Sequence, residues 1–353
     1  MLWFLVILLF IVVNSAHIAA RDRFAKDYLS KEKTNVIKGI FVILVVFKHY
    51  SSYADFSGIY DEPIVVLNQH LGQMIVAMFL FYSGYGIMES ISKKGFAYIK
   101  AIPSRRLVKV WGNFALAVLM YLLLSVCIGE HYHVSTILLA FTGWRSVGNS
   151  NWYMFAIMAL YILTFFAFYC SKFFPSHKKY YFSALLLTLL TVILVYAEMK
   201  AGQPSWFYNT CILFPLGTWY SLLKERVEKI AMKNDIIYSF LCLVMICCYI
   251  IAWNNRGNYG IEGYSIWAVI FTLTIILFTM KISIQSEILG WFGEQVFGIY
   301  ILQRIPMIVL NYFGLTATHK YASLVVVIAC TVFLTQIFDL GTERIWKRVY
   351  NSF

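Results

Sequence analysis

Long stretches of apolar residues alternate with short polar segments along almost the whole chain. A helix needs about 20 apolar residues to cross the hydrocarbon core of a bilayer. Backbone groups in lipid must bond within their own segment, which selects helices. The pattern therefore predicts an all-α fold, a polytopic membrane helix bundle of about 11 transmembrane helices. The stretches lie at 2–20, 34–51, 71–90, 107–128, 151–170, 180–198, 206–223, 235–253, 263–280, 288–311 and 321–339.

The composition argues against an ordinary soluble protein. Of the 353 residues, 61% are hydrophobic and 13% are charged, whereas soluble domains are roughly 45–50% apolar and about 25% charged. The seven cysteines fall within apolar stretches and lack the spacing of a disulfide framework or a metal site. The first stretch has neither a basic segment before it nor a clear cleavage site. We therefore expect it to be a transmembrane helix rather than a signal peptide.

The net charge of +12 is distributed unevenly between the two sets of connecting segments. If the eleven stretches cross in alternation, one set of connections carries 22 Lys and Arg residues and the other carries 4. Cytoplasmic loops are enriched in Lys and Arg. We therefore expect a multi-pass protein of the cell membrane, with the N-terminus outside and the C-terminus in the cytoplasm. This topology explains the basic charge of the chain. We therefore expect membrane lipids, and no nucleic acid, as partners of the protein.

Two ionisable residues, Lys38 and His49, lie within the stretch 34–51. Eleven steps of about 100° place them within about 20° of one helix face and about 16 Å apart along the axis. Ionisable groups inside a membrane are costly and commonly functional. Alternatively, Lys38 extends to lipid headgroups and His49 simply ends a helix. The spacing alone leaves both interpretations open.

A basic cluster, defined here as Arg105, Arg106 and Lys109, lies where the fourth stretch begins. At helical spacing the three side chains share one side of the helix, an arrangement that suits a phosphate-bearing ligand. Anchoring to anionic lipid headgroups requires the same arrangement. The sequence around the cluster does not decide between the two.

The third stretch contains the run Phe79-Leu-Phe-Tyr-Ser-Gly-Tyr-Gly86. Small residues let membrane helices approach closely, so we expect Gly84 and Gly86 to serve packing. Ser83 and Tyr85 are polar side chains in the same run. They are candidates for lining a polar cavity.

Taken together, these motifs resemble the acyltransferase-3 family of integral membrane acyltransferases. The hallmark of that family is Arg or Lys, ten residues and then His, as at Lys38 and His49. A phenylalanine-rich Ser-Gly-Tyr segment and an Arg-Arg-x-x-Arg-like cluster come next in the family pattern, and 79–86 and 105–109 are similar to them. The resemblance extends over about residues 33–340, and it is the order and spacing of the motifs that make it specific.

Two later segments, 151–154 and 292–300, resemble further motifs of the family. The chain also departs from the pattern. The late motif often ends in Tyr-x-x-His, but here Tyr300 is followed by Gln303, so no second histidine role is expected. Lys109 replaces an arginine, which retains the charge but not the planar, bidentate donor.

The resemblance also divides the chain. The family core usually has ten helices, and this chain has one more before it. We expect residues 1–33 to form an extra N-terminal transmembrane helix and a basic cytoplasmic loop, and residues 34–353 to form the acyltransferase-3-like membrane domain.

The resemblance implies an O-acetyltransferase of a bacterial plasma membrane. Such an enzyme moves acetyl from cytoplasmic acetyl-CoA to a hydroxyl of a cell-surface or exported glycan, or of a lipid-linked sugar. The identity of the acceptor, and acetyl versus a succinyl or longer acyl group, stay open. His49 would be the general base, with Lys38 as a second catalytic residue. The basic cluster would hold the phosphates of CoA, and no metal is expected. The candidate substrate-binding residues are Ser83, Tyr85, Trp152 and Arg304.

Two other functions compete with this interpretation. A transporter or flippase of lipid-linked sugars needs a pathway lined by polar residues from several helices, and only Lys38, Lys48, His49, Glu294 and Arg304 qualify. The chain also lacks the paired halves of many transporters. A second class of membrane-bound acyltransferase would carry a histidine deep in a late helix, and no late stretch contains one. The oligomeric state stays open.

Overall fold

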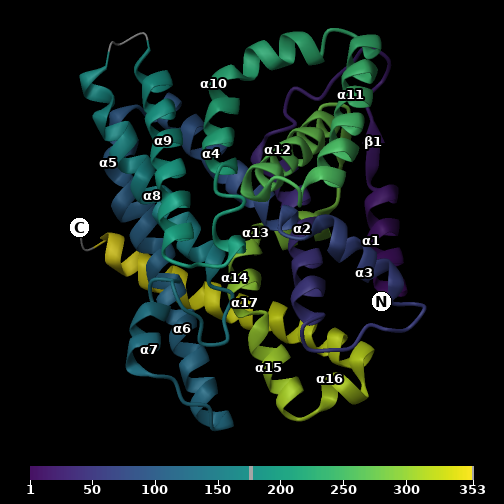
Figure 1. The fold of residues 1–353 in the computed structure, drawn as a ribbon, viewed down its shortest axis with the longest axis vertical. Helices are drawn as coiled ribbons and strands as arrows, with labels where there is room; N and C mark the ends of the chain where they lie inside the picture. Colours follow the sequence, from purple (N-terminus) through teal and green to yellow (C-terminus); the bar gives the residue numbers. More distant parts are fainter. Residues whose placement is uncertain (175–177, 352–353) are drawn as a thin grey trace.

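The computed structural model describes residues 1–174 and 178–351, which form a bundle of helices (Figure 1). The α-helices are α1 (Leu2–Asn14), α2 (Lys31–Tyr50), α3 (Glu62–Leu71), α4 (Met74–Lys94), α5 (Phe96–Ile102), α6 (Lys109–Ile128), α7 (Val134–Ala140), α8 (Trp152–Tyr169), α9 (Lys179–Lys200), α10 (Leu213–Ala231), α11 (Asp235–Asn255), α12 (Gly260–Thr279), α13 (Glu287–Glu294), α14 (Val296–Leu302), α15 (Arg304–Tyr312), α16 (Leu315–Thr318) and α17 (Lys320–Asn351). The remaining elements are the π-helix η1 (Pro103–Val108), the 3₁₀ helices η2 (Cys170–Phe173) and η3 (Ser205–Phe207), and the strands β1 (Ala16–Ile18) and β2 (Ile282–Ile284).

Among the described residues, seven helical segments are long and apolar enough to cross a membrane. They are Met74–Lys94, Phe96–Ile128, Trp152–Phe173, Lys179–Lys200, Asp235–Asn255, Gly260–Thr279 and Lys320–Tyr350. The predicted all-α, polytopic membrane class is therefore confirmed.

Helices occur in all eleven expected stretches, but four of them differ in form. The stretch 206–223 begins with η3, and α10 starts only at Leu213 and continues to Ala231. The helix expected over 2–20 ends at Asn14, and the next residues form β1, which pairs antiparallel with β2. With 13 residues, α1 is about 20 Å long, which is less than the hydrocarbon thickness of about 30 Å. The stretch 288–311 is divided into α13, α14 and α15. The fourth expected stretch, 107–128, belongs to a longer helical segment that begins at Phe96, in a part of the chain expected to form a connection.

Helix α2, which carries Lys38 and His49, lies in the interior of the bundle (Figure 1). The Oγ atom of Ser30 accepts a hydrogen bond from the backbone N–H of Lys33 and caps its first turn. The opposite helix is α13, whose backbone comes unusually close. A Cβ on Gly39 would lie 1.8 Å from the carbonyl oxygen of Leu289. Only glycine permits this approach, which fixes α2 against α13.

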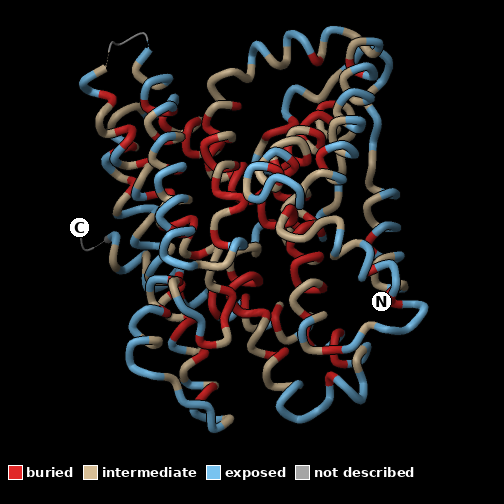
Figure 2. The backbone as a smooth tube through the Cα atoms, in the orientation of Figure 1, coloured by how far each residue is buried: buried red, intermediate tan, exposed pale blue. Residues whose placement is uncertain are grey.

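Helices α4 and α10 meet through a second close backbone contact. A Cβ on Gly84 would lie 1.9 Å from the carbonyl oxygen of Phe214, and a Cβ on Gly217 would lie 2.1 Å from that of Phe81. The buried residues follow these inner helices, whereas much of α9 and α11 is exposed (Figure 2). The exposed side chains of α11 are largely apolar, as expected for a helix that faces lipid.

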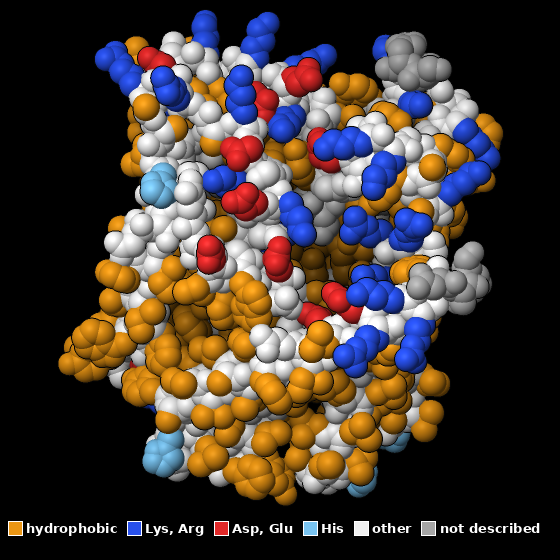
Figure 3. Space-filling view, turned by 180° about the vertical axis from the view of Figure 1, so that it is seen from behind, with side chains coloured by type: hydrophobic (Ala, Val, Ile, Leu, Met, Phe, Trp, Pro, Cys, Tyr) orange, Lys and Arg blue, Asp and Glu red, His pale blue; other side chains and the backbone are white. Residues whose placement is uncertain are grey.

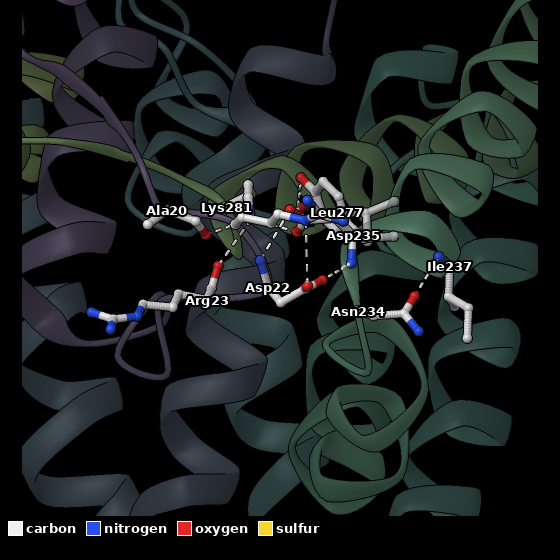
Figure 4. A network of polar contacts seen from close by, with 10 residues as sticks. Ala20, Asp22, Arg23, Asn234, Asp235, Ile237, Leu277 and Lys281 are labelled. Carbon is white, nitrogen blue, oxygen red and sulfur yellow. Dashed lines mark hydrogen bonds and ion pairs between the residues drawn. The ribbon is translucent and has the colours of Figure 1, made fainter.

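Segments distant in sequence are joined by a polar network that we call the N-terminal latch: Ala20, Asp22, Arg23, Asp235 and Lys281 (Figure 4). The Lys281 ammonium donates hydrogen bonds to the carbonyl oxygens of Ala20 and Arg23, at 3.0 and 3.1 Å, and pairs with the Asp235 carboxylate. Asp22 and Asp235 each accept a hydrogen bond from the backbone N–H of the other, at 2.8 and 3.0 Å. The latch holds the segment before α2 against the ends of α11 and α12.

Charged side chains are concentrated on one part of the surface. Figure 3 shows Lys and Arg gathered over one end of the molecule and around a central hollow, while the other end is mostly hydrophobic. This asymmetry agrees with the uneven charge of the connecting segments.

We predict that Gly84→Ala lowers the thermal unfolding temperature of the detergent-solubilised protein. Its new methyl group would force α4 and α10 apart, and overpacking of this kind costs about 1–3 kcal/mol. Gly86→Ala is the matched control, because a Cβ there would meet no atom within 4 Å. Equal unfolding temperatures for the two variants would contradict the proposed role of Gly84.

Candidate active site

A cavity of about 560 Å³ opens beside Lys38. The side chain of Lys38 shares it with Tyr85 and Gly86 of α4. Tyr85 therefore lines a polar cavity, as predicted, while Gly86 contributes open space rather than a helix contact. We call this space the Lys38 cavity. It is lined by Lys26, Asp27, Leu29, Ser30, Lys31, Thr34, Lys38, Tyr82, Tyr85, Gly86, Glu89, Lys93, Arg106 and Lys224.

A second cavity, of about 660 Å³, contains the whole basic cluster. We call it the Lys109 cavity, and it shares Lys31 and Arg106 with the Lys38 cavity. Three carboxylates also line it, those of Glu294, Asp339 and Glu343. The whole basic cluster therefore lines the Lys109 cavity, and Arg106 also lines the adjoining Lys38 cavity.

The local backbone explains how the basic cluster is presented. Pro103 begins the π-helix η1, which includes Arg105 and Arg106 and continues into α6 at Lys109. A π-turn within an α-helical segment is rare and often occurs at a functional site. The Arg106 Nε donates a hydrogen bond of 3.0 Å to the Tyr98 hydroxyl, which orients the guanidinium.

His49 lies near the other end of α2, among residues that are distant in sequence. Its Nδ1 is 3.4 Å from the Oγ of Ser150, and its ring centroid is 6.0 Å from that of Tyr300. Gln303 and Arg304 are also electrostatic neighbours of the imidazole. His49 is thus partly enclosed by polar side chains instead of facing lipid.

Several of these polar neighbours have no hydrogen-bond partner among the described residues. They are the Tyr300 hydroxyl, the Gln303 Oε1 and the Arg304 Nε, all of them buried atoms. An unpaired buried polar atom costs about 1–3 kcal/mol. Groups kept at such a cost beside a histidine are suited to bind a polar substrate.

A row of tyrosines connects the surroundings of His49 with the basic cluster. The ring centroids of Tyr153 and Tyr300 are 5.3 Å apart, and Tyr300 contacts His49. Ser83 lies within hydrogen-bonding reach of both Tyr153 and Tyr161. Tyr161 in turn interacts electrostatically with Arg106, the residue of the basic cluster that lines both cavities. We call Tyr161, Tyr153 and Tyr300 the tyrosine row.

Arg304, whose partner the sequence could not name, begins α15 beside His49. The hydroxyl of Tyr53 is its polar neighbour, and the nearby Tyr121 hydroxyl donates to the Ile301 carbonyl oxygen at 3.0 Å. A positive charge surrounded mainly by tyrosines in a membrane helix is costly. Arg304 is therefore placed to interact with negative charge near His49.

The segment that follows His49 is held by polar contacts around Asp61, which we call the Asp61 clamp. The Asp61 carboxylate pairs with the Lys320 ammonium at 2.6 Å and accepts a hydrogen bond from the Tyr321 hydroxyl at 3.0 Å. Burial opposes the charge of Asp61, but hydrogen bonds from Lys320, the N-terminal amine and Tyr321 lower its pKa. The Tyr50 hydroxyl donates to the Lys320 carbonyl oxygen at 2.7 Å. The clamp thus ties the residue after His49 to α17.

Trp152 is less directly connected to this region than the other candidates. Its ring packs at a right angle to Tyr153, with the centroids 6.2 Å apart, and Tyr153 belongs to the tyrosine row. Sequence reasoning did not identify Ser150, Gln303 or Tyr300 as partners of His49. Two signals were available in the sequence: Ser150 is next to the motif-like segment 151–154, and Tyr300 and Gln303 lie at the end of the motif-like segment 292–300 and just after it.

Comparison with known proteins assigns the part of the chain that contains these residues to a protein family. The model of one protein family, described as an acyltransferase domain (Acyl_transf_3), matches residues 32–339. No curated protein and no solved structure matches the chain. The match covers most of the chain and includes Lys38, His49, the basic cluster and the tyrosine row. The chain belongs to the acyltransferase-3 family, and it is an integral membrane acyltransferase.

Proposed function

We propose that this protein is an O-acetyltransferase that moves acetyl from cytoplasmic acetyl-CoA to a hydroxyl of a cell-surface or exported glycan. The membrane would be a bacterial plasma membrane, with the N-terminus outside. The observation that carries the proposal is the tyrosine row, which joins two basic cavities to a histidine about 16 Å away along α2. The acyl donor has the same form, since a flexible pantetheine arm separates its phosphates from its thioester.

The basic cavities lie at the end that we assign to the cytoplasm. Guanidinium and ammonium groups bind phosphate through charge-assisted hydrogen bonds, and the basic cluster supplies three of them. Lys38 stands at the inner end of the path and Tyr85 on its wall. The pantetheine arm would pass Ser83 and the tyrosine row, with Trp152 packed behind Tyr153.

His49 would act as general base on the acceptor hydroxyl. Its neutral imidazole takes the hydroxyl proton while the oxygen attacks the thioester carbonyl carbon. The tetrahedral oxyanion then collapses, the carbon–sulfur bond breaks, and the leaving CoA sulfur receives the proton from the imidazolium. The Ser150 Oγ lies 3.4 Å from Nδ1 and would orient the ring, so that Nε2 would take the proton of the acceptor hydroxyl.

Arg304 would stabilise the oxyanion. In a site sheltered from water, a fixed positive group directed at developing negative charge strongly lowers the barrier. Arg304 is an electrostatic neighbour of His49 and its Nε is unpaired among the described residues. The guanidinium is thus available where the carbonyl oxygen becomes negative.

We predict that His49→Ala reduces acetyl transfer about 10²–10⁴-fold, the contribution typical of a general base. Mass spectrometry of surface glycans would show loss of acetyl groups from cells that carry this variant in place of the natural protein. Release of CoA by the purified protein would fall in parallel.

His70→Ala is the matched control, because His70 stacks on Trp253 with the centroids 4.3 Å apart and lies outside the candidate site. It is expected to leave glycan acetylation unchanged. If His49→Ala also leaves acetylation intact, the catalytic role of His49 is wrong. If loss of the protein alters glycan export but not acetylation, a transporter replaces the proposed enzyme.

We predict opposite effects of Arg304→Met on activity and stability. Loss of an oxyanion-stabilising group should lower the transfer rate about 10²–10³-fold. Removing a poorly compensated charge from the bundle should leave the thermal unfolding temperature equal or raise it. Arg256→Met is the control, because the Arg256 guanidinium packs 3.3 Å from the Trp253 ring centroid. That variant should lose stability and keep its activity; lower stability in Arg304→Met would contradict the idea.

A further inference from the structure

One wall of the Lys38 cavity comes from residues before the region that matches the family. Lys26, Asp27, Leu29 and Ser30 line the cavity, whereas the match begins at residue 32. The N-terminal latch fixes the chain just before them, through Lys281 and Asp235 (Figure 4). The segment is therefore built into the cavity.

A second contact fixes this wall from inside the bundle. Tyr28 is buried, and its hydroxyl lies 2.8 Å from that of Tyr220 in α10. One helical turn further along α10, the Lys224 ammonium lies 5.6 Å from the Tyr28 ring centroid and 6.0 Å from that of Tyr85. Two aromatic rings thus hold Lys224 at the cavity, with only 26% of its side chain exposed.

The two adjoining cavities differ in their balance of charge. Six basic and two acidic side chains line the Lys38 cavity, and four basic and three acidic side chains line the Lys109 cavity. One of the two acids in the Lys38 cavity, Glu89, already accepts from Ser221 at 2.8 Å and pairs with Lys93 at 3.6 Å. Lys224 has a partner in Glu228 at 3.7 Å, but the surplus of positive charge remains in the Lys38 cavity.

We propose that Lys26 and Lys224, together with Arg106, bind the diphosphate of the acyl donor in the Lys38 cavity. This inference rests on the proposed function, in which the donor is acyl-CoA. CoA carries phosphate at two separate places, a diphosphate between ribose and pantetheine and a monophosphate on the ribose. Two adjoining cavities joined by Arg106 match that division. The diphosphate, from which the pantetheine arm leaves, belongs in the Lys38 cavity, where basic side chains outnumber acidic ones by six to two, and the ribose monophosphate belongs beside Arg105 and Lys109.

The placement also fits the path of the acyl group. The pantetheine arm leaves from the diphosphate, so the diphosphate must bind where the path to His49 begins. Lys38 and Tyr85 line that cavity. The segment before the family match is then part of the donor site, and Lys26 is its contribution.

Isothermal titration of the purified full-length protein with CoA and with dephospho-CoA, which lacks the ribose monophosphate, tests the division. Lys26→Gln and Lys224→Gln should each raise the Kd about tenfold for both ligands, the loss expected for one charge-assisted contact. Lys33→Gln and Lys229→Gln are the matched controls. Lys33 lines a different cavity and Lys229 lies in α10, five residues beyond Lys224. Both controls should bind as the unchanged protein does.

The double variant Arg105→Gln/Lys109→Gln supplies the complementary result. It should weaken binding of CoA about tenfold or more and leave binding of dephospho-CoA nearly unchanged. The inference is overturned if Lys26→Gln and Lys224→Gln bind both ligands normally, or if the unchanged protein binds neither. If the variants show the predicted binding pattern but the protein transfers no acyl group, the proposed function is wrong and the phosphate site stands. If the protein shows His49-dependent acyl transfer but not the binding pattern, the proposed function stands and the phosphate site is wrong.

Discussion

The contact on which the candidate site depends is the approach of helix backbones to within a distance that only glycine allows. Gly39 follows Lys38 directly and meets the Leu289 carbonyl, while Gly293 meets the Asn35 carbonyl. Residues of α2 and α13 are thereby interlocked, without an intervening layer of side chains. Because side-chain layers adjust more easily than backbones, this contact sets the position of α2 rigidly. Lys38 and His49, which both lie on α2, are placed accordingly.

The second glycine contact acts on the opposite side of the same space. Gly84 lies between Ser83 and Tyr85, and it seats α4 on α10 at Phe214. The polar residues of α4 therefore face α2 and α8 at a fixed distance, and Lys224 of α10 reaches the cavity beside Tyr85. The packing residue Gly84 is adjacent in sequence to the polar residues Ser83 and Tyr85, because a glycine that brings two helices together also determines where its polar neighbours point.

Features that depend on local geometry alone could be predicted from the sequence. The spacing of Lys38 and His49 holds because α2 is one unbroken helix from Lys31 to Tyr50. The partners of His49 could not be predicted, since Ser150 and Tyr300 come from chain segments about 100 and 250 residues away. Nor does any rule of spacing distinguish Gly84, which meets a backbone, from Gly86, which borders a cavity. The breaks within 288–311 fall at the polar pairs Glu294-Gln295 and Gln303-Arg304, but the apolar residues between them made the stretch resemble one continuous helix.

Positive charge at two places in the candidate site costs the folded protein free energy. The Lys38 cavity holds more cations than anions, and the Arg304 Nε beside His49 has no partner among the described residues, so positive charge lies at both ends of the tyrosine row. In a membrane, like charges without partners destabilise the folded chain. A substrate with negative phosphates at one end and developing negative charge at the other would neutralise both. The free energy released by that neutralisation is available for catalysis only if the two positive regions are held apart, and a rigid α2 holds them apart.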